Sequence, residues 1–555
     1  MASPKGEVEN GDRAPVAAAE SKGSPGDGDA TVSKSKAYTI SVILFCVNIL
    51  NYIDRYTIAG VLTSIQNYYS INNALAGLLS TVFVVFLMCF SPLFGFLGDR
   101  YSRKRIIIAG MIIWIVTVFA STFIPANLFW LFALSRGIVG IGQASFTVIS
   151  PSVIGDLFSG DARSRMLMFL YLAIPFGSGL GFIISSTVAA FAGDWHWGVR
   201  VTAPFGILFI VLVIVLTVDP ERGSADDKDP HHGHAKAGHT GFLEDLWSLI
   251  KNHTYMFSLA AYTLIVFASG TIAWWFPSAL EHHFAGQYGY NSTDMLEKSE
   301  KARVNLIFGA ITCIGGIVGV ILGTLLSELI RNGRGPFRLV QTERSDPIVC
   351  GLGALIAAPS LFIALRTSHY KMVLAWTFLF ICITAACFNW ATNVNMVLSV
   401  VVPYQRNAAT ACQVAISHLF GDSFGPYLLG LVSDAIRGGD ESPAANFHSL
   451  EISFYIPDVF LFISSLLFFA AAFTFIRDRR RFQERMGQQP KENESPREAA
   501  GIGLSALKGS QTVQDGDGES NSQRSGSYSQ PDGDATSATK EDSKTTLGSR
   551  ENEEG

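Results

Sequence analysis

Twelve long apolar segments constrain the fold of this 555-residue chain more than any other feature. A helix of about 20 apolar residues crosses the hydrocarbon core of a bilayer, and each segment is long enough to do so. A transmembrane β-barrel would show short alternating segments instead. The sequence therefore predicts an all-α polytopic membrane protein with twelve transmembrane helices, near 38–62, 75–98, 106–124, 128–150, 166–192, 200–218, 254–278, 304–330, 347–366, 371–401, 408–436 and 452–476.

Most charged residues lie outside these segments. They make up 16% of the chain, against about 25% in soluble domains, and they crowd into residues 1–36, 219–251, 331–346 and the stretch after Arg477. This distribution excludes a soluble enzyme and a nucleic-acid-binding protein. The seven cysteines fall inside or at the edges of apolar segments, so no extracellular disulfide framework is expected.

The same charge pattern predicts the domain organisation. Residues 1–36 and 478–555 are polar and are expected to form disordered cytosolic tails. Two six-helix bundles, 37–218 and 254–477, flank a cytosolic linker, 219–253, whose end has the spacing of a short amphipathic helix. The linker also carries a histidine cluster, which we interpret as solvated sequence rather than a metal site, so no metal or cofactor is expected: His231, His232, His234 and His239.

The basic residues of the short loops predict the orientation in the membrane. Loops 99–105 and 331–346 each carry four Lys or Arg residues, whereas the opposite loops 67–74 and 125–127 carry none. Basic loops stay on the cytosolic side, so both termini are expected in the cytosol. The sequon at Asn291 then falls outside, where glycosylation is permitted.

The two halves of the sequence resemble each other. Residues 95–100, 323–328 and 430–434 each read as a small-residue turn closed by a carboxylate, which we expect at a cytosolic helix end. Residues 151–165 likewise resemble 403–406. Two parallel six-helix halves are the architecture of alternating-access carriers, with the substrate at the interface between them.

Charged residues of the repeated loops are candidates for gates. A carboxylate there can meet the positive N-terminal end of a facing helix and pair with a neighbouring arginine, which would latch the cytosolic side shut. The alternative is ordinary positive-inside loop chemistry. The candidate gating residues are Asp99, Arg100, Arg103, Lys104, Asp156, Arg163, Glu328 and Asp434.

Ionisable residues inside the predicted helices are candidates for a functional site, because a charge in the bilayer is costly unless it is paired or faces water. The helical rise places Asp54 and Arg136 at about the same depth, so a contact between them is allowed. Arg55 points elsewhere around its helix. Guanidinium groups bind phosphate in a bidentate fork, so Arg55 and Arg136 are candidates for an anionic head group. The alternative is a structural ion pair.

His418 and Asp422 are four residues apart and share one face of their predicted helix. A histidine near the midplane suits proton exchange near neutral pH, so a proton relay or a substrate contact is expected, with a hydrogen-bonded packing histidine as the alternative. Asp54, His418 and Asp422 are the proton-coupling candidates. The substrate-binding candidates are Asp54, Arg55, Arg136, Gln143, Asn389 and His418.

Several sequence blocks identify a known family. The stretch GFLGDRYSRK resembles the signature loop of the major facilitator superfamily. More narrowly, the chain resembles the Spinster family, and this implies the twelve-helix fold and export of a sphingolipid or lysolipid, such as sphingosine-1-phosphate or a lysophospholipid. The blocks are NYIDRYTIAGVL (51–62), LSRGIVGIGQAS (134–145), IPFGSGLGF (174–182), AGDWHWGVR (192–200) and SHLFGDSFGPYLLGLVSD (417–434).

One departure from the family pattern concerns proton coupling. Relatives carry a glutamate in the fourth helix where this chain has Gln143, which does not titrate. The tenth helix carries asparagines, among them Asn389, where relatives tend to place carboxylates. Uniport, coupling through Asp54 or His418, and a mechanism without protons all stay open.

We therefore expect a secondary active or facilitative transporter of a phosphorylated amphiphilic lipid. The alternatives are a carrier for another organic anion or a sugar, and a lipid-binding sensor without transport. An enzyme is not expected, because no nucleophile motif or metal triad is visible. The expected partners are the lipid substrate, a coupling ion (proton or sodium) and the bilayer, with a monomeric chain in the plasma membrane or in the late endosomal or lysosomal membrane.

Overall fold

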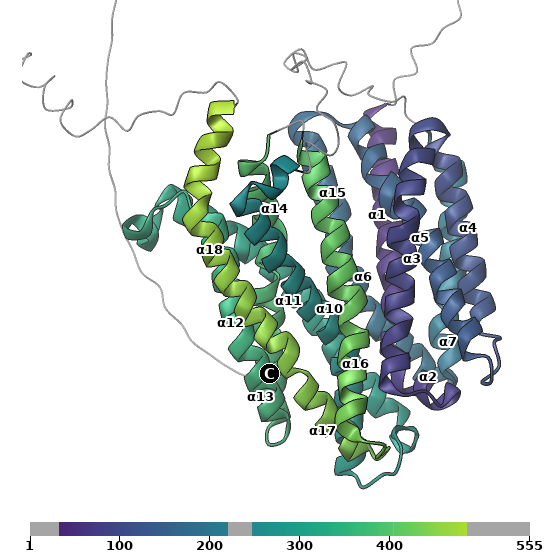
Figure 1. Ribbon diagram of the computed structural model, residues 1–555. Coiled ribbons are helices and arrows are strands. Elements are labelled where there is room, and N and C mark those ends of the chain that lie inside the picture. The colour runs from purple at the N-terminus through teal and green to yellow at the C-terminus, as the bar shows by residue number, and fades with distance from the viewer. Residues whose placement is uncertain (1–32, 220–246, 403–404, 486–555) are drawn as a thin grey trace, which may run out of the picture. The chain divides into compact units, whose positions relative to one another are not determined.

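The computed structural model describes residues 33–219, 247–402 and 405–485 (Figure 1). All regular elements in these ranges are helical. The predicted tails beyond them, the histidine cluster and most of the predicted amphipathic segment lie outside the described residues. Residues 247–250 at the end of that segment are helical.

The first half of the described chain, called the N half here, forms six membrane-spanning units. Its first unit bends, because α1 continues through a single 3₁₀ turn into α2. Its last unit is made of α7 and α8. The elements are α1 (Lys34–Thr57), η1 (Ala59–Val61), α2 (Leu62–Tyr69), α3 (Asn73–Arg100), α4 (Arg103–Ser121), α5 (Phe129–Leu157), α6 (Gly160–Ala192), α7 (Trp195–Arg200) and α8 (Thr202–Leu216).

The second half, called the C half, repeats this plan with more interruptions. Its elements are α10 (His253–Gln287), η2 (Thr293–Met295), α11 (Lys298–Asn332), η3 (Gly335–Val340), α12 (Ser345–Ser368), α13 (Met372–Ala386), α14 (Asn389–Val400), α15 (Arg406–Ser417), the π-helix η5 (His418–Ser423), α16 (Phe424–Arg437), α17 (Pro443–Ser453) and α18 (Tyr455–Arg485).

The structure confirms the predicted twelve-helix architecture. Eleven described helices are long and apolar enough to cross a membrane. The remaining predicted span, 408–436, is the eleventh in chain order, and it is divided into α15, η5 and α16. A π-helical turn inside a helix is rare and is frequent at functional sites. The divided span 408–436 therefore marks the region to search for a site.

The last helix ends later than the hydropathy pattern predicts. The C half was expected to stop at residue 477, but α18 continues to Arg485. Asp478 explains the extension, because its carboxylate accepts hydrogen bonds from the Thr254 backbone N–H (3.0 Å) and hydroxyl (2.8 Å) at the start of α10. The first turn of α18 beyond residue 477 is thus attached to the start of α10 by buried hydrogen bonds and not by apolar contacts alone.

The repeat between the halves is visible in matched arginines. Arg163 donates to the carbonyl oxygens of Gly155 (2.7 Å) and Phe158 (2.9 Å). Arg406 donates to those of Leu398 (2.9 Å) and Val401 (3.3 Å). In both cases the acceptors lie eight and five residues before the arginine. Each arginine therefore satisfies the free carbonyl groups at the end of the preceding helix.

Two ends of the helices are distinguished here. The terminal end holds the start of α1 and the end of α18, and the far end holds the turns that join α2 to α3 and α16 to α17 (Figure 1). The described side-chain hydrogen bonds between the halves run from Arg55 to the far end. The pairs are Arg55–Asp422, Ser80–Asp422, Thr81–Ser423, Thr63–Glu281, Asn67–Thr293, Asn73–Ser433, Asn73–Asn446, Asn73–Asp434, Ala74–Asp434 and Lys298–Gly193.

Close backbone contacts accompany these bonds. On α6 and α11, a Cβ atom at Gly179 would lie 2.4 Å from the Gly309 carbonyl oxygen, and the reverse substitution gives the same distance. A Cβ atom at Gly77 of α3 would lie 2.3 Å from the Pro426 carbonyl oxygen on α16. Such approach needs residues without a side chain. The halves are therefore packed together over the far part of their interface.

Candidate functional site

A cavity of about 200 Å³ lies between the two halves. Much of its wall is apolar, from side chains such as Ile174, Phe308 and Leu461, and it includes the ionisable residues Arg55, His418 and Asp422. A second cavity of about 20 Å³ is lined in part by Arg55 and Asp422 as well. These two side chains therefore border both spaces, and they give the larger cavity a charged wall.

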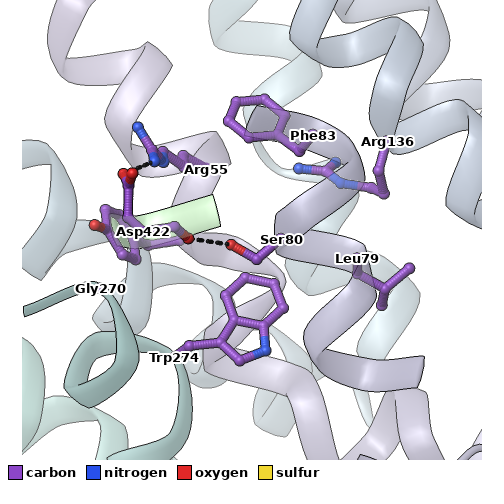
Figure 2. A pocket seen from close by; sticks show the side chains of 9 residues that line it. Arg55, Leu79, Ser80, Phe83, Arg136, Gly270, Trp274 and Asp422 are labelled. Atoms are coloured by element: carbon purple, nitrogen blue, oxygen red, sulfur yellow. Dashed lines mark hydrogen bonds and ion pairs between the residues drawn. The ribbon is translucent and has the colours of Figure 1, made fainter. Parts of the chain in front are cut away.

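Arg55 and Asp422 form an ion pair that joins the halves (Figure 2). Both side chains are largely buried. The Nδ1 atom of His418 lies 2.9 and 3.0 Å from the two carboxylate oxygens of Asp422. The prediction that His418 and Asp422 share a face is thus confirmed, and the π-helical turn η5 carries both. Asp422 is the central group of a three-residue charged cluster.

Arg136 belongs to the smaller cavity and not to this ion pair. Figure 2 shows its guanidinium group beside Phe83, on the side away from Asp422. The guanidinium carbons of Arg55 and Arg136 lie 5.4 and 5.8 Å from the centre of the Phe83 ring. One terminal nitrogen of Arg136, Nη1, has no hydrogen-bond partner among the described residues. Arg136 is therefore a buried cation with spare donor capacity.

Asp54 lies inside the N half and lines neither of these cavities. Its carboxylate accepts hydrogen bonds from the side-chain N–H groups of Trp114 (2.9 Å) and Gln143 (3.1 Å) and the Thr202 hydroxyl (3.2 Å). The contact with Arg136 that helix depth allowed is absent, since no ion pair of Asp54 is found among the described residues. Neutral donors on three neighbouring helices occupy the carboxylate instead.

Asn389 also lies outside the cavities. It is fully buried, and its Nδ2 atom donates to the Ala386 carbonyl oxygen at 3.3 Å. Of the predicted substrate-binding residues, the structure brings Arg55, Arg136 and His418 to the two cavities. It places Asp54, Gln143 and Asn389 in packed surroundings behind them.

Three tyrosines of the larger cavity were not predicted. Tyr52 and Tyr56 flank Arg55 on α1, and Tyr262 lies on α10. Helical spacing offered a signal for Tyr52, because it precedes Arg55 by three residues and so shares its face. Phenol groups combine a large apolar ring with a hydroxyl group that can bind an anion. They add polar capacity beside the charged cluster.

The predicted gating residues of the N half make contacts at the terminal end. Arg103 pairs with Asp156, and the Lys104 ammonium group donates to the carbonyl oxygens of Ile214 (2.7 Å) and Thr217 (2.8 Å). The Arg100 guanidinium lies 3.8 Å from the Phe96 ring centre. The side chain of Asp99 is outside the described set.

In the C half, Glu328 is the gating candidate that the repeat suggested. It is exposed, and no ion pair of Glu328 is found in the described part of the chain. Its neighbour Arg331 pairs instead with Asp346 (2.6 Å), which also accepts a hydrogen bond from the Ser327 hydroxyl (2.5 Å). In this conformation the partner of Arg331 is therefore the buried Asp346 carboxylate on the following helix α12, and not the exposed Glu328 carboxylate.

Asp434 lies at the far end of the helices. The prediction that it lies on the same side of the membrane as Asp99 is therefore wrong. The repeated letters suggested the same side, but α16 runs towards the far end, whereas α3 runs away from it. The Asp434 carboxylate accepts hydrogen bonds from the backbone N–H groups of Asn73 (3.2 Å) and Ala74 (2.7 Å) at the start of α3. Arg437 also donates to it at 3.0 Å. It therefore caps a helix of the opposite half.

The glycosylation candidate Asn291 also lies at the far end. It is exposed, in the turn between α10 and η2.

Asp194, the N-cap residue of α7, has a shifted pKa. Burial and a contact with His196 act on this pKa in opposite directions. Burial raises the pKa, but the hydrogen bonds and the charge of His196 outweigh it, so the pKa of Asp194 is lowered.

Comparison with known proteins shows extensive similarity. The profile of the Major Facilitator Superfamily matches residues 44–340. Protein spinster homolog 3 of Danio rerio is 38% identical over 463 residues, which cover 83% of this chain and 90% of the relative. The Sphingosine-1-phosphate transporter SPNS2 of Mus musculus is 38% identical over 449 residues, which cover 81% of this chain and 79% of the relative.

A solved structure shares the fold. It is a bacterial homolog of the human lysosomal transporter Spinster in an inward-facing and unoccupied conformation. It matches with a TM-score of 0.68 and 20% sequence identity, over 81% of this chain and 99% of that chain. The similarity in sequence and in fold thus extends over the membrane helices that build both cavities.

Proposed function

The chain belongs to the Spinster family of the major facilitator superfamily, and we propose that this multi-pass membrane transporter carries a phosphorylated amphiphilic lipid by alternating access. The substrate class is sphingosine-1-phosphate or a lysophospholipid. The observation that carries the proposal is the cavity between the halves, which combines an apolar wall with Arg55, His418 and Asp422. The relative named as a sphingosine-1-phosphate transporter supports the same class.

The cavity suits a molecule with one anionic end and one apolar end. A phosphate group would bind the Arg55 guanidinium in bidentate fashion, in exchange for the Asp422 carboxylate. His418 in its protonated form would then partner Asp422. Arg136 supplies further donors beyond Phe83. The acyl or sphingoid chain would lie against Ile174, Phe308 and similar side chains, where its apolar surface is removed from water.

Closure at the far end supports loading from the terminal end. In alternating access one side is shut while the substrate site is reached from the other. We place both termini in the cytosol on the basis of the basic loops, so the lipid enters from the cytosol. The far-end cap by Asp434 must release for export. Asp99, Arg100, Arg103, Lys104, Asp156, Arg163 and Glu328 would act at the terminal end in the opposite conformation.

We propose three alternative arrangements for how transport is driven. Asp422 is held by Arg55 and His418, so a proton taken up by this cluster would weaken the ion pair and free Arg55 for a phosphate. Asp54 is the second candidate for coupling by a proton or sodium ion, and uniport is the third arrangement. We expect a monomer in the plasma membrane or the late endosomal or lysosomal membrane, with glycosylation at Asn291.

Lipid flux tests the proposal. Proteoliposomes containing the wild-type chain should move labelled sphingosine-1-phosphate or lysophospholipid, and Arg55→Ala should reduce the flux at least tenfold. Arg366→Ala is the matched control, because Arg366 pairs with Glu451 away from both cavities, and it should keep the wild-type rate. Competition by sugars or small organic anions without lipid competition would instead support a different carrier. Saturable lipid binding without flux would support a sensor.

A further inference from the structure

We propose that Glu281 is a proton-binding site that holds the far end of the transporter shut, and that its proton is exchanged with the solution on the far side. Glu281 lies near the end of α10, apart from the charged cluster of Arg55, His418 and Asp422. None of the groups discussed so far as coupling candidates contacts it. The inference rests on the proposed alternating access and adds a ligand, the proton, at a separate place.

The carboxyl group of Glu281 bridges the two halves. One oxygen accepts a hydrogen bond from the hydroxyl group of Thr63 on α2, in the N half. The other accepts one from the Nδ2 atom of Asn305 on α11 at 2.8 Å. The Glu281 residue is only 4% exposed. Separation of the halves at the far end therefore has to break the Thr63 contact.

The surroundings of Glu281 offer neutral donors but no cation in contact. No Lys, Arg or His nitrogen among the described residues lies within 4.0 Å of its carboxylate. Two lysines of α11 line the same cavity as Glu281. The Lys301 ammonium group lies 3.7 Å from Asp294, and the Lys298 ammonium group donates to the Gly193 carbonyl oxygen. Neither lysine is within ion-pair distance of Glu281, although the charge of Lys301 still acts on the carboxyl group and favours its ionised form.

This arrangement suits a neutral carboxyl group. A buried carboxylate without a paired cation is strongly disfavoured, whereas a protonated carboxyl group needs only hydrogen-bond partners, which Thr63 and Asn305 supply. Opening of the far end would replace Thr63 by water and make the ionised form favourable. Protonation and closure are then linked, and each stabilises the other by the same free energy.

The route of the proton follows from the position of Glu281. It lines a cavity of about 350 Å³ at the far end, to which both halves contribute, with Thr63 and Asn67 on one side and Asp294 on the other. Neither central cavity includes Glu281. The proton therefore enters and leaves on the far side. It sets how often the far gate opens and is not carried across the membrane.

Other titratable groups face the same region, and the test has to separate them from Glu281. His196 and Asp194 line the far cavity beside α7, and His282 follows Glu281 on α10 with its Nδ1 atom unpartnered among the described residues. The remaining titratable groups that line this cavity are Tyr68 of α2, Asp294 of η2 and Lys298 and Lys301 of α11. His283 follows His282 on α10, and the charge of Arg437 of α16 acts on His282.

Accessibility of the far cavity tests the proposal without a lipid. Ser64 lines this cavity, so Ser64→Cys is labelled with a membrane-impermeant maleimide in oriented proteoliposomes, and modification of that peptide is measured by mass spectrometry. The comparison spans far-side pH 5.5 to 8. Labelling rates are corrected for the change in thiolate reactivity with pH, which is measured on a reference cysteine, Tyr370→Cys, at a position that is 87% exposed. We expect the corrected rate to rise with far-side pH, by up to about tenfold per pH unit, which is the limit for release of one proton.

Three variants decide the assignment. Glu281→Gln keeps the hydrogen-bonding shape but not the titration, so labelling should stay low at every pH. Thr63→Val removes the cross-half bond, so labelling should be higher throughout while its pH dependence persists. In His196→Gln and His282→Gln the labelling rate should depend on pH as it does in the parent protein. A flat parent profile, or a parent-like profile in Glu281→Gln, overturns the proposal, and neither result depends on whether the substrate is a lipid.

Discussion

Arg55 of α1 and Asp422 of the π-helix η5 form an ion pair across the two halves, at a wall shared by the larger and the smaller central cavities. A charged pair of this kind joins binding to conformation, because an anionic head group that takes Arg55 has to displace Asp422. Removal of one partner leaves the other buried charge uncompensated. Binding of the anionic lipid should therefore weaken when Arg55 is replaced and tighten when Asp422 is replaced.

Asp422→Asn is expected to tighten the binding of a phosphorylated lipid. The substitution removes the competing carboxylate, so Arg55 is free to bind phosphate, and the dissociation constant should fall by roughly tenfold, the value of one charge-assisted hydrogen bond. Flux should fall because Arg55 then lacks its partner for release of the head group. Equilibrium binding to purified protein in nanodiscs measures the first effect. Weaker binding in Asp422→Asn would contradict the exchange between carboxylate and phosphate.

The Asp434 cap should control closure of the far end. Asp434→Asn removes the negative charge from the start of α3, a contribution of about 1 kcal/mol, so the far cavity should become about fivefold more accessible to a cysteine-reactive probe at Ser64→Cys. Asp440→Asn is the matched control. Asp440 lies in the next turn but is bonded to Ser442 of its own half, so accessibility should stay at the parent value. Equal effects of both substitutions would contradict the cap.

The packing of α6 against α11 gives a prediction for stability. Gly309→Ala places a methyl group 2.4 Å from the Gly179 carbonyl oxygen, so this interface has to separate, and the melting temperature of the purified protein should fall by several degrees. Gly155→Ala is the control, because a Cβ atom there meets no atom within 4 Å. Alanine favours a helix by about 0.5–1 kcal/mol over glycine, so Gly155→Ala should melt at the parent temperature or above.

The sequence was sufficient for the helices and for part of the central site. Twelve apolar segments set the number of helices, and the spacing of His418 and Asp422 placed both on one face. Depth along a helix did not tell which way a side chain points around it. Asp54 and Arg55 have nearly the same depth, but neighbouring residues differ by about 100° around the axis, so Asp54 bonds inside the N half and Arg55 reaches the cavity.

Direction along the chain explains the error at Asp434. Its small-residue turn matches that of Asp99 in composition, but composition does not record whether the helix runs towards or away from a given end. Glu281 and its partner Thr63 gave no signal of contact, because 218 residues separate them. Pairings of this kind depend on how the two halves meet, and local sequence patterns carry no information on that geometry.

Gln143 offers a test of how proton coupling is built. Its side-chain nitrogen lies 3.1 Å from the Asp54 carboxylate, so Gln143→Glu would put a second carboxyl group in hydrogen-bond contact with the first. Two carboxylates at this distance do not both ionise readily, and one holds a proton that the other shares. We expect the variant to keep the fold while its lipid flux gains a dependence on pH that is steeper than that of the wild-type chain.

The measurement is flux in proteoliposomes between pH 5.5 and 8, with equal pH on both sides and then with a gradient. Gln143→Glu should respond to the gradient, whereas Gln143→Leu, which supplies no proton site, should not. Asp54→Asn combined with Gln143→Glu should return the flux to a shallow pH dependence, because a single carboxyl group lacks the charged neighbour that makes the pair share a proton. A steep dependence that persists in this double variant would show that the proton is held elsewhere, with the cluster of Asp422 and His418 as the remaining central candidate.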